Sequence, residues 1–303
     1  MTAATEYELK GFEPDNLLAF LALLGLLRAL DIGQPKWRAR AFWRSVPLTA
    51  ILQIEPEVSA TTMIDAVHDG IRALGTKYEF DRKDLKFSAD DYRAIVTTAG
   101  SDRDRLGLLA AMASDAITKR GSVEVEPTAL CAMFGQGHQH FLARLKSVVQ
   151  RDKPSDQRDL SRALFQPWQY EDNTESFRWD PIEDRRYAHQ SGNPSKPSNK
   201  IGTISGANRL AAIGFGILTC VPTARGLTTL GVARFGRRRE VCWPLPGAPT
   251  SLAGYRALLA HPDLGDDDKG TALAAVGVRA ISRARRYQVG KYFNFERARV
   301  QFL

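Results

Sequence analysis

The sequence predicts an α+β fold, with a mainly helical middle and small antiparallel sheets built from N- and C-terminal strands. Alternating, strand-like segments occur near both ends, residues 60–150 follow helical periodicity, and polar residues dominate residues 152–200. With 303 residues, of which 44% are hydrophobic, the chain can bury a complete core without metal or disulfide staples.

The N-terminal part predicts two strands and one buried helix. Residues 6–11 alternate like a short strand, and Asn16 has the chemistry of an N-cap. The helix that follows, at residues 17–29, is apolar almost all round, which predicts burial. Residues 37–43 again alternate, and we expect this second strand to pair with the first.

The middle and C-terminal parts complete the predicted order. Helices are expected at residues 62–74, 88–98, 103–118, 134–149, 206–219 and 251–260, and strands at residues 227–235, 240–243 and from 273 onward. The first two of these strands form a hairpin with a basic turn. The chain divides into an N-terminal region (1–151), an aromatic- and charge-rich loop region (152–205) and a basic α+β region (206–303) packed on the first.

The cysteine pattern and the apolar segments indicate a cytoplasmic protein without membrane contact. Cys131, Cys220 and Cys242 form no CxxC pair and lie among apolar neighbours, as buried reduced thiols do. The strongest apolar run, residues 17–30, contains Arg28 and is too short to span a bilayer. Acidic residues stand where a signal peptide requires a basic region.

The positive charge is concentrated at the C-terminal end. Residues 225–303 contain 14 Lys and Arg against 6 Asp and Glu, a net charge of +8, whereas residues 1–224 contain 28 of each sign. This asymmetry favours a polyanion-binding region on a neutral scaffold, because basic side chains that displace counterions from phosphates bind nucleic acid independently of sequence. The alternative is a solvated basic surface.

A basic and aromatic set near the C-terminus is the most specific binding signal. Arginines and a lysine interleaved with aromatic residues suit a groove in which phosphates are neutralised while bases stack. The alternative is a basic strand face beside core aromatics. The residues of this set are Arg237, Arg238, Arg239, Arg279, Arg283, Arg285, Arg286 and Lys291, and Arg279, Arg283 and Arg285 are predicted to share one strand face.

The segment 193–209 (NPSKPSNKIGTISGANR) runs from a polar loop into a helix. Its Ser/Gly-rich entry lacks the spacing of a nucleotide-binding loop, so it does not indicate ATP binding. Lys196, Lys200, Asn208 and Arg209 are candidate contacts to the nucleic-acid backbone or to base edges. An ordinary flexible loop is the alternative.

Two further motifs carry groups that could ligate metal. Residues 177–189 (FRWDPIEDRRYAH) contain carboxylates and a histidine that suit a metal-dependent nuclease: Asp180, Glu183, Asp184 and His189. Arg178, Arg185 and Arg186 can neutralise these carboxylates, which favours an ion-pair lattice or phosphate contacts. The second motif is the His138-x-His140 pair, for which a turn and helix start is the better interpretation. We therefore predict no catalytic residue, no metal and no cofactor.

Several stretches along the chain are distinctive in combination: PDNLLAFLALLGLLRAL, FGQGHQHFLARL, ALFQPWQY, RWDPIEDRRYAH, PSKPSNK to GANRLA, WPLP and VGKYFNF. In these stretches the chain resembles the CRISPR-associated proteins of type I-G (formerly I-U) systems, in the group proposed as a small form of the effector complex's large subunit. The resemblance spans nearly the whole chain. One departure is the run IGFG at 213–216, where a bulkier apolar run is expected.

The resemblance implies a noncatalytic subunit of an RNA-guided complex that recognises the protospacer-adjacent motif in duplex DNA. Its implied partners are the other effector subunits, guide RNA, double-stranded target DNA and a separate helicase-nuclease. Lys196, Lys200, Asn208 and Arg209 are then expected near the motif duplex, and the C-terminal arginines on the nucleic-acid backbone or the guide. Two alternatives stay open: a nuclease or guide-processing enzyme using His138, His140 or His189 with Asp180 or Asp184, and a pure assembly protein.

Overall fold

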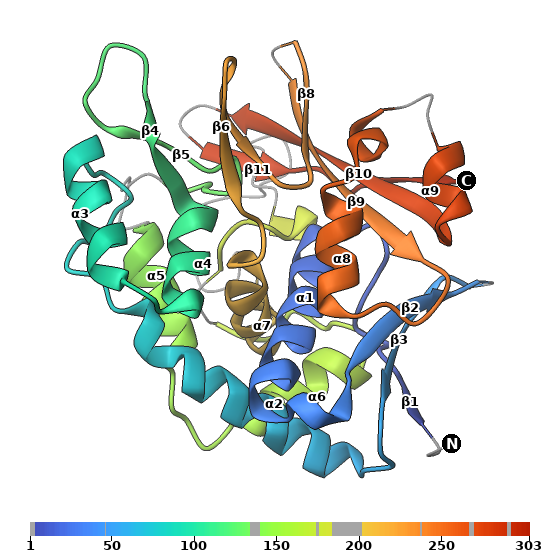
Figure 1. Ribbon diagram of the computed structural model, residues 1–303. Helices are drawn as coiled ribbons and strands as arrows, with labels where there is room; N and C mark the ends of the chain where they lie inside the picture. Colours follow the sequence, from blue (N-terminus) through green and yellow to red (C-terminus); the bar gives the residue numbers. More distant parts are fainter. Residues whose placement is uncertain are drawn as a thin grey trace, which may run out of the picture.

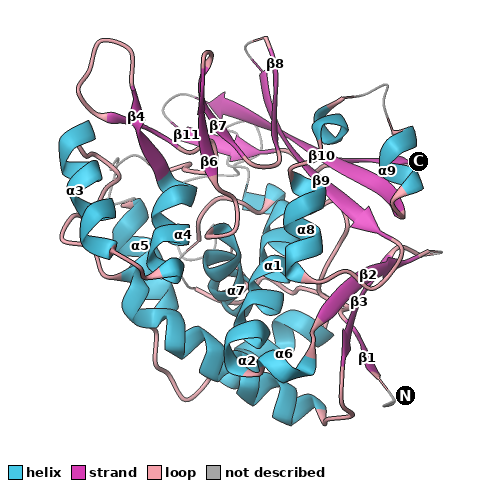
Figure 2. Ribbon diagram, viewed as in Figure 1, coloured by secondary structure: helices cyan, strands magenta, loops and turns pink. Residues whose placement is uncertain are grey.

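The computed structural model describes residues 4–45, 47–133, 140–173, 176–183, 202–236, 238–266, 270–289 and 292–303. It confirms the predicted α+β class, with a helical middle and antiparallel strands toward both ends of the chain. Figure 2 shows most of the helices in the lower and left-hand parts of the molecule and the strands along its upper and right-hand sides, where α8 and α9 lie beside them.

Helix α1 (Leu17–Gly33) runs through the centre of the molecule (Figure 1). Asn16 caps it as predicted, since its side chain accepts hydrogen bonds from the amides of Leu18 (2.9 Å) and Ala19 (3.3 Å). All residues from 17 to 30 are buried, which confirms the burial predicted from the apolar sequence.

Helix α7 (Ser205–Phe215) crosses α1 at close range. A Cβ atom at Gly25 would lie 1.8 Å from the backbone oxygen of Leu210, and one at Gly214 would lie 2.0 Å from that of Leu21. Glycine at both positions therefore lets the two backbones touch. Gly214 lies in the run IGFG at 213–216, and the close crossing leaves no room for a side chain at this position.

Three helices pack around this pair: α2 (Ala60–Gly75), α5 (Phe141–Val149) and α6 (Asp156–Phe165). The first two confirm predicted helices, although residues 134–139 lie outside the described residues. Helix α6 contradicts the loop predicted at residues 152–200. Its polar sequence has a short apolar stripe, and two of its five buried residues are acidic, so periodicity did not reveal it.

The N-terminal sheet consists of β1 (Thr5–Glu8), β2 (Arg40–Arg44) and β3 (Thr49–Ile54), in the order β1-β3-β2. The predicted direct pairing of the first two strands is therefore wrong, because β3 lies between them and pairs antiparallel with both. The alternation within the second strand is confirmed, since Ala41 and Trp43 are buried while Phe42 is half-buried.

The predicted helix at 103–118 is wrong in its second half. After α3 (Ala89–Ala99), helix α4 (Arg103–Met112) ends where Ala113 turns to extended backbone, and β4 (Ala113–Thr118) pairs with β5 (Val125–Pro127).

The C-terminal sheet has the order β11-β10-β9-β8, with β12 also on β10. The predicted hairpin is confirmed as β8 (Val232–Phe235) and β9 (Arg238–Pro246), but the strand predicted at residues 227–235 is divided by a turn at residues 230–231. The strand predicted from residue 273 begins only at Val278, because residues 271–275 are helical. A separate hairpin consists of β6 (Cys220–Thr223) and β7 (Gly226–Thr229). The remaining elements are α8 (Leu252–Leu259), α9 (Thr271–Ala275), β10 (Val278–Val289), β11 (Tyr292–Phe295), β12 (Arg299–Phe302) and the short helices η1 (Pro35–Trp37), η2 (Thr76–Tyr78), η3 (Pro181–Glu183) and η6 (Pro262–Gly265).

One hydrophobic core joins these parts. Trp243 of β9 stacks on Phe20 of α1 with ring centroids 5.5 Å apart, and Phe177 and Trp179 pack with Phe215 in the same cluster. The three cysteines are free and buried, as predicted.

Candidate nucleic-acid interface

The upstream candidate residues fall into two groups. Those outside the described residues are Arg185, Arg186, Lys196 and Lys200. Asn208 and Arg209 lie on α7, and each residue is only 1% exposed. The side-chain amide of Asn208 donates to the backbone oxygen of Ile204 (3.1 Å). The structure therefore contradicts the predicted direct contact of these two residues with nucleic acid, because the core covers both side chains.

Arg209 instead belongs to a buried ion-pair network that joins α7 to α6. Its Nη1 lies 2.7 Å from Oδ2 of Asp156, whose Oδ1 lies 2.7 Å from Nε of Arg151. Arg151 also lies 3.0 Å from Asp159. Burial lowers the pKa of Arg209, and the nearby Asp156 carboxylate opposes that shift. The network balances two guanidinium groups with two carboxylates, so it carries no surplus charge.

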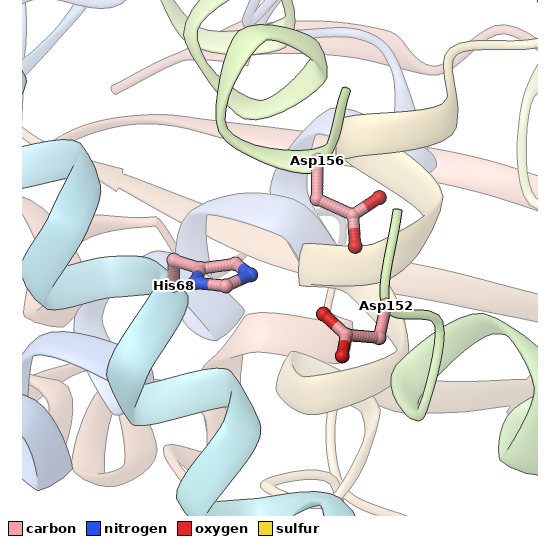
Figure 3. Close-up of side chains that lie close together, drawn as sticks. All are labelled: His68, Asp152 and Asp156. Atoms are coloured by element: carbon pink, nitrogen blue, oxygen red, sulfur yellow. The ribbon is translucent and has the colours of Figure 1, made fainter. Parts of the chain in front are cut away.

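A group of possible metal ligands lies beside this network. His68 of α2, Asp152 and Asp156 each offer one ligand atom, and these atoms lie within 4.8 Å of one another (Figure 3). A cation there would face the guanidinium groups of Arg151 and Arg209, which already contact Asp156. Burial, followed by the charge of Arg209, lowers the pKa of His68. A metal ion would therefore have to displace the two arginines from Asp156, which argues against a metal site here.

The residues of the enzyme alternative are engaged in local contacts where the structure describes them. The Nδ1 atom of His140 lies 3.0 Å from both carboxylate oxygens of Asp84. Asp180 is 2% exposed, accepts a hydrogen bond from the amide of Ile182 (3.0 Å), and has a pKa raised by burial. The other residues of that alternative lie outside the described residues: His138, Asp184 and His189.

The arginines predicted to share one face of β10 differ in exposure. Arg279 lies at a β-bulge, is exposed, and donates to the hydroxyl of Ser45 (2.7 Å). Arg283 is 3% exposed and donates to the backbone oxygen of Asp266 (2.8 Å). Arg285 is exposed. The predicted nucleic-acid contact of Arg283 is therefore contradicted, since the segment at 262–266 covers it, whereas Arg279 and Arg285 are accessible.

Three antiparallel hairpins project side by side from the upper side of the molecule, as Figure 1 shows: β4–β5, β6–β7 and β8–β9. Basic residues occupy the ends and flanks of all three. We call this surface the hairpin face and define it by Lys119, Arg120, Arg225, Arg234, Arg238 and Arg239. Of the predicted residues, Arg238 and Arg239 belong to it, while Arg237 and Lys291 lie outside the described residues.

At the base of the hairpin face, three arginines stand next to one another on adjacent strands. Arg234 of β8 pairs in register with Arg239 of β9, which pairs with Arg286 of β10. We call these three residues the arginine ladder. Glu126, the middle residue of β5, lies 2.9 Å from Arg239 and 3.6 Å from Arg234.

Arg286 is the most enclosed member of the ladder. Its guanidinium carbon lies 3.8 Å from the centre of the Phe293 ring, and Nη2 is 3.4 Å from the backbone oxygen of Cys131. Its Nε is buried and has no hydrogen-bond acceptor among the described residues. Burial, together with the charge of Arg239, lowers the pKa of Arg286 to about 10, so the group stays charged at neutral pH.

Sequence reasoning missed several residues of this surface. The Gly121-Ser122 pair was a usable turn signal for the end of the first hairpin, but the helix predicted through residue 118 obscured it. No local signal exists for Glu126, because its arginine partners are more than 100 residues away along the chain.

Comparison with known proteins adds no family assignment. A scan against protein-family models and a search of curated proteins both find no match to this chain. Among the described residues, no helix combines the length and the apolar character needed to cross a bilayer.

Proposed function

We propose that this chain is a noncatalytic nucleic-acid-binding subunit that holds a polyanion on its hairpin face. The observation that carries the proposal is the convergence of three hairpins with basic ends on one side of the molecule. Exposed basic side chains displace counterions from phosphates, and a two-stranded ribbon is narrow enough to enter the major groove of a duplex. Lys119 is partly neutralised by Glu124 (2.6 Å), whereas Arg120, Arg225 and Arg238 are exposed at the hairpin ends.

On the basis of the family resemblance, we propose that the bound polyanions are guide RNA and double-stranded target DNA. The chain then acts in the cytoplasm within a type I CRISPR effector complex and recognises the protospacer-adjacent motif in the duplex. It contacts other subunits and leaves strand cleavage to a separate helicase-nuclease. Of the residues expected near the motif, Lys196 and Lys200 remain proposed contacts, and Arg185 and Arg186 remain proposed contacts to phosphate; all four lie outside the described residues.

Fluorescence anisotropy with labelled duplex DNA across a salt series tests the binding proposal. Replacing both Arg225 and Arg238 with Gln is expected to reduce the slope of log affinity against log salt by about 2, since each lost phosphate contact removes about 0.9. The matched control replaces Arg38 and Arg44, two exposed arginines of the N-terminal part paired with Glu55 and Glu6, with Gln. This control should keep the original slope.

Equal slopes for the two double variants would contradict binding through the hairpin face and favour the assembly role. Co-purification with the neighbouring gene products tests the CRISPR part separately. We expect a complex that contains RNA, and binding of that complex to a duplex should depend on a short motif. Failure to form such a complex would remove the CRISPR assignment while leaving the binding measurement to stand.

A further inference from the structure

The arginine ladder is an unfavourable arrangement for a protein without a ligand. Residues directly opposite each other on antiparallel strands have Cβ atoms about 4.5–5.5 Å apart and point to the same face, and like charges in such positions destabilise a sheet. Here Arg234, Arg239 and Arg286 occupy consecutive positions across three strands. Three positive charges therefore lie in one row.

Only part of this charge is compensated within the described residues. Glu126 contacts Arg239 at 2.9 Å and Arg234 at 3.6 Å, and it also accepts a hydrogen bond from the amide of Leu227 (3.4 Å). Arg286 has no carboxylate partner among the described ion pairs. Three guanidinium groups against one carboxylate leave a surplus of two positive charges.

The ladder is nevertheless firmly held. Arg234 donates to the backbone oxygens of Arg225 and Leu227, both at 2.6 Å, which ties β8 to the β6–β7 hairpin. The guanidinium group of Arg286 packs over the ring of Phe293. The side chains of Arg234 and Arg239 are 26% and 28% exposed. The charges are thus fixed in position but open to solvent, as required for binding a small anion.

We infer that the arginine ladder binds a phosphate group and that the carboxylate of Glu126 competes with this phosphate for Arg234 and Arg239. Guanidinium groups match the oxygens of phosphate with paired hydrogen bonds, and within the described part of the chain the buried Nε of Arg286 has no acceptor. A phosphate that enters would take over the partners now held by Glu126. The source of the phosphate, a strand end or the backbone, rests on the proposed function.

Titration with inorganic phosphate, against chloride at matched ionic strength, tests the site in the full chain. Isothermal calorimetry or the shift in melting temperature reports binding. We expect Arg239→Gln to weaken phosphate binding about tenfold, and Glu126→Gln to strengthen it by a similar factor, because each change alters a charge-assisted hydrogen bond. Arg286→Lys keeps the positive charge but loses the paired N–H donors of the planar guanidinium group, so it should also weaken phosphate binding.

The N-terminal sheet offers a matched control pair. Arg44 and Glu6 form a comparable exposed ion pair at 2.7 Å, so Arg44→Gln and Glu6→Gln should leave phosphate binding unchanged within twofold. Circular dichroism of all variants verifies that they fold. Phosphate binding that is absent, or that responds equally to Arg239→Gln and Arg44→Gln, would overturn the inference.

Oligonucleotides with and without a 5′-phosphate distinguish the two sources. A strand-end site predicts tighter binding of the phosphorylated strand, and a backbone site predicts equal binding; in both cases Arg239→Gln must weaken it. If oligonucleotides bind while inorganic phosphate does not and Arg239→Gln has no effect, the ladder inference fails and the proposed function stands. If phosphate binds but oligonucleotides do not, the proposed function fails and the ladder site stands.

Discussion

Two arginine clusters of this molecule use the same side chain in opposite ways. Around α6 and α7, Arg151 and Arg209 face Asp156 and Asp159, so positive and negative charges are equal and buried. At the base of the hairpin face, Glu126 is the one carboxylate that the described ion pairs give to the arginine ladder; it contacts Arg234 and Arg239, which are about a quarter exposed.

The difference shows that the charge balance of a cluster, rather than the presence of arginine, distinguishes a structural role from a binding role. A buried, balanced network has no charge left for a ligand and becomes costly when one partner is removed. An exposed cluster with surplus charge contributes little to stability, because solvent screens it, but attracts anions. The two clusters therefore respond differently to the same kind of substitution.

The largest expected effect comes from removing the central carboxylate of each cluster. Asp156→Ala leaves Arg209, which is 1% exposed, without its carboxylate, and should lower the free energy of unfolding by about 3–5 kcal/mol. Glu126→Ala should cost less than about 1 kcal/mol, because its partners are solvated. Urea denaturation of both variants measures the contrast. Similar decreases in the free energy of unfolding for Asp156→Ala and Glu126→Ala would contradict the difference drawn between the two clusters.

An intermediate effect is expected on β10, where two arginines of one face differ in burial. Arg283→Met removes a buried hydrogen bond to the backbone oxygen of Asp266 and should destabilise the protein by about 1–3 kcal/mol. Arg285 is exposed, so Arg285→Met should change stability by less than about 0.5 kcal/mol. It should instead reduce the salt slope of DNA binding by about 0.9.

Urea denaturation and the anisotropy salt series of the hairpin variants together check this pair. An exchange of roles, in which Arg283→Met alters only binding and Arg285→Met only stability, would contradict the burial of Arg283 and the exposure of Arg285.

The smallest expected effect is the pH dependence of His68, which borders the buried network. Its pKa is lowered from the ordinary 6.5 by burial and by Arg209. The unfolded chain therefore takes up a proton near pH 6.5, while the folded chain does so only at lower pH, so stability should decrease as pH falls through 6.5 and level off below the folded-state pKa. Comparing His68→Gln with the parent chain between pH 5 and 8 isolates the effect. An unchanged pH profile would place the titration elsewhere.

Local chemistry was enough to predict several elements. Asn16 before a long apolar run gave the start and burial of α1, and the basic turn between two apolar runs gave the β8–β9 hairpin. Elements that depend on distant partners were missed. Helix α6 buries Asp156 and Asp159, and no periodicity rule places acidic residues in a core unless their arginine partners are known.

For the candidate site, too, local sequence predicts some features, whereas others depend on residues distant in the chain. The C-terminal excess of charge follows from the sequence. The burial of Asn208, Arg209 and Arg283 does not, because neighbours from α6 and from residues 262–266 cover them.

The sequence by itself therefore determined the fold class, the central helix and the region of surplus charge, since these depend on residue types and spacing along one stretch of chain. Only the tertiary structure decided which arginines are neutralised and which remain available. The reason is physical: burial and ion pairing depend on residues brought together from far apart, as Glu126 is with Arg239 and Asp156 with Arg209.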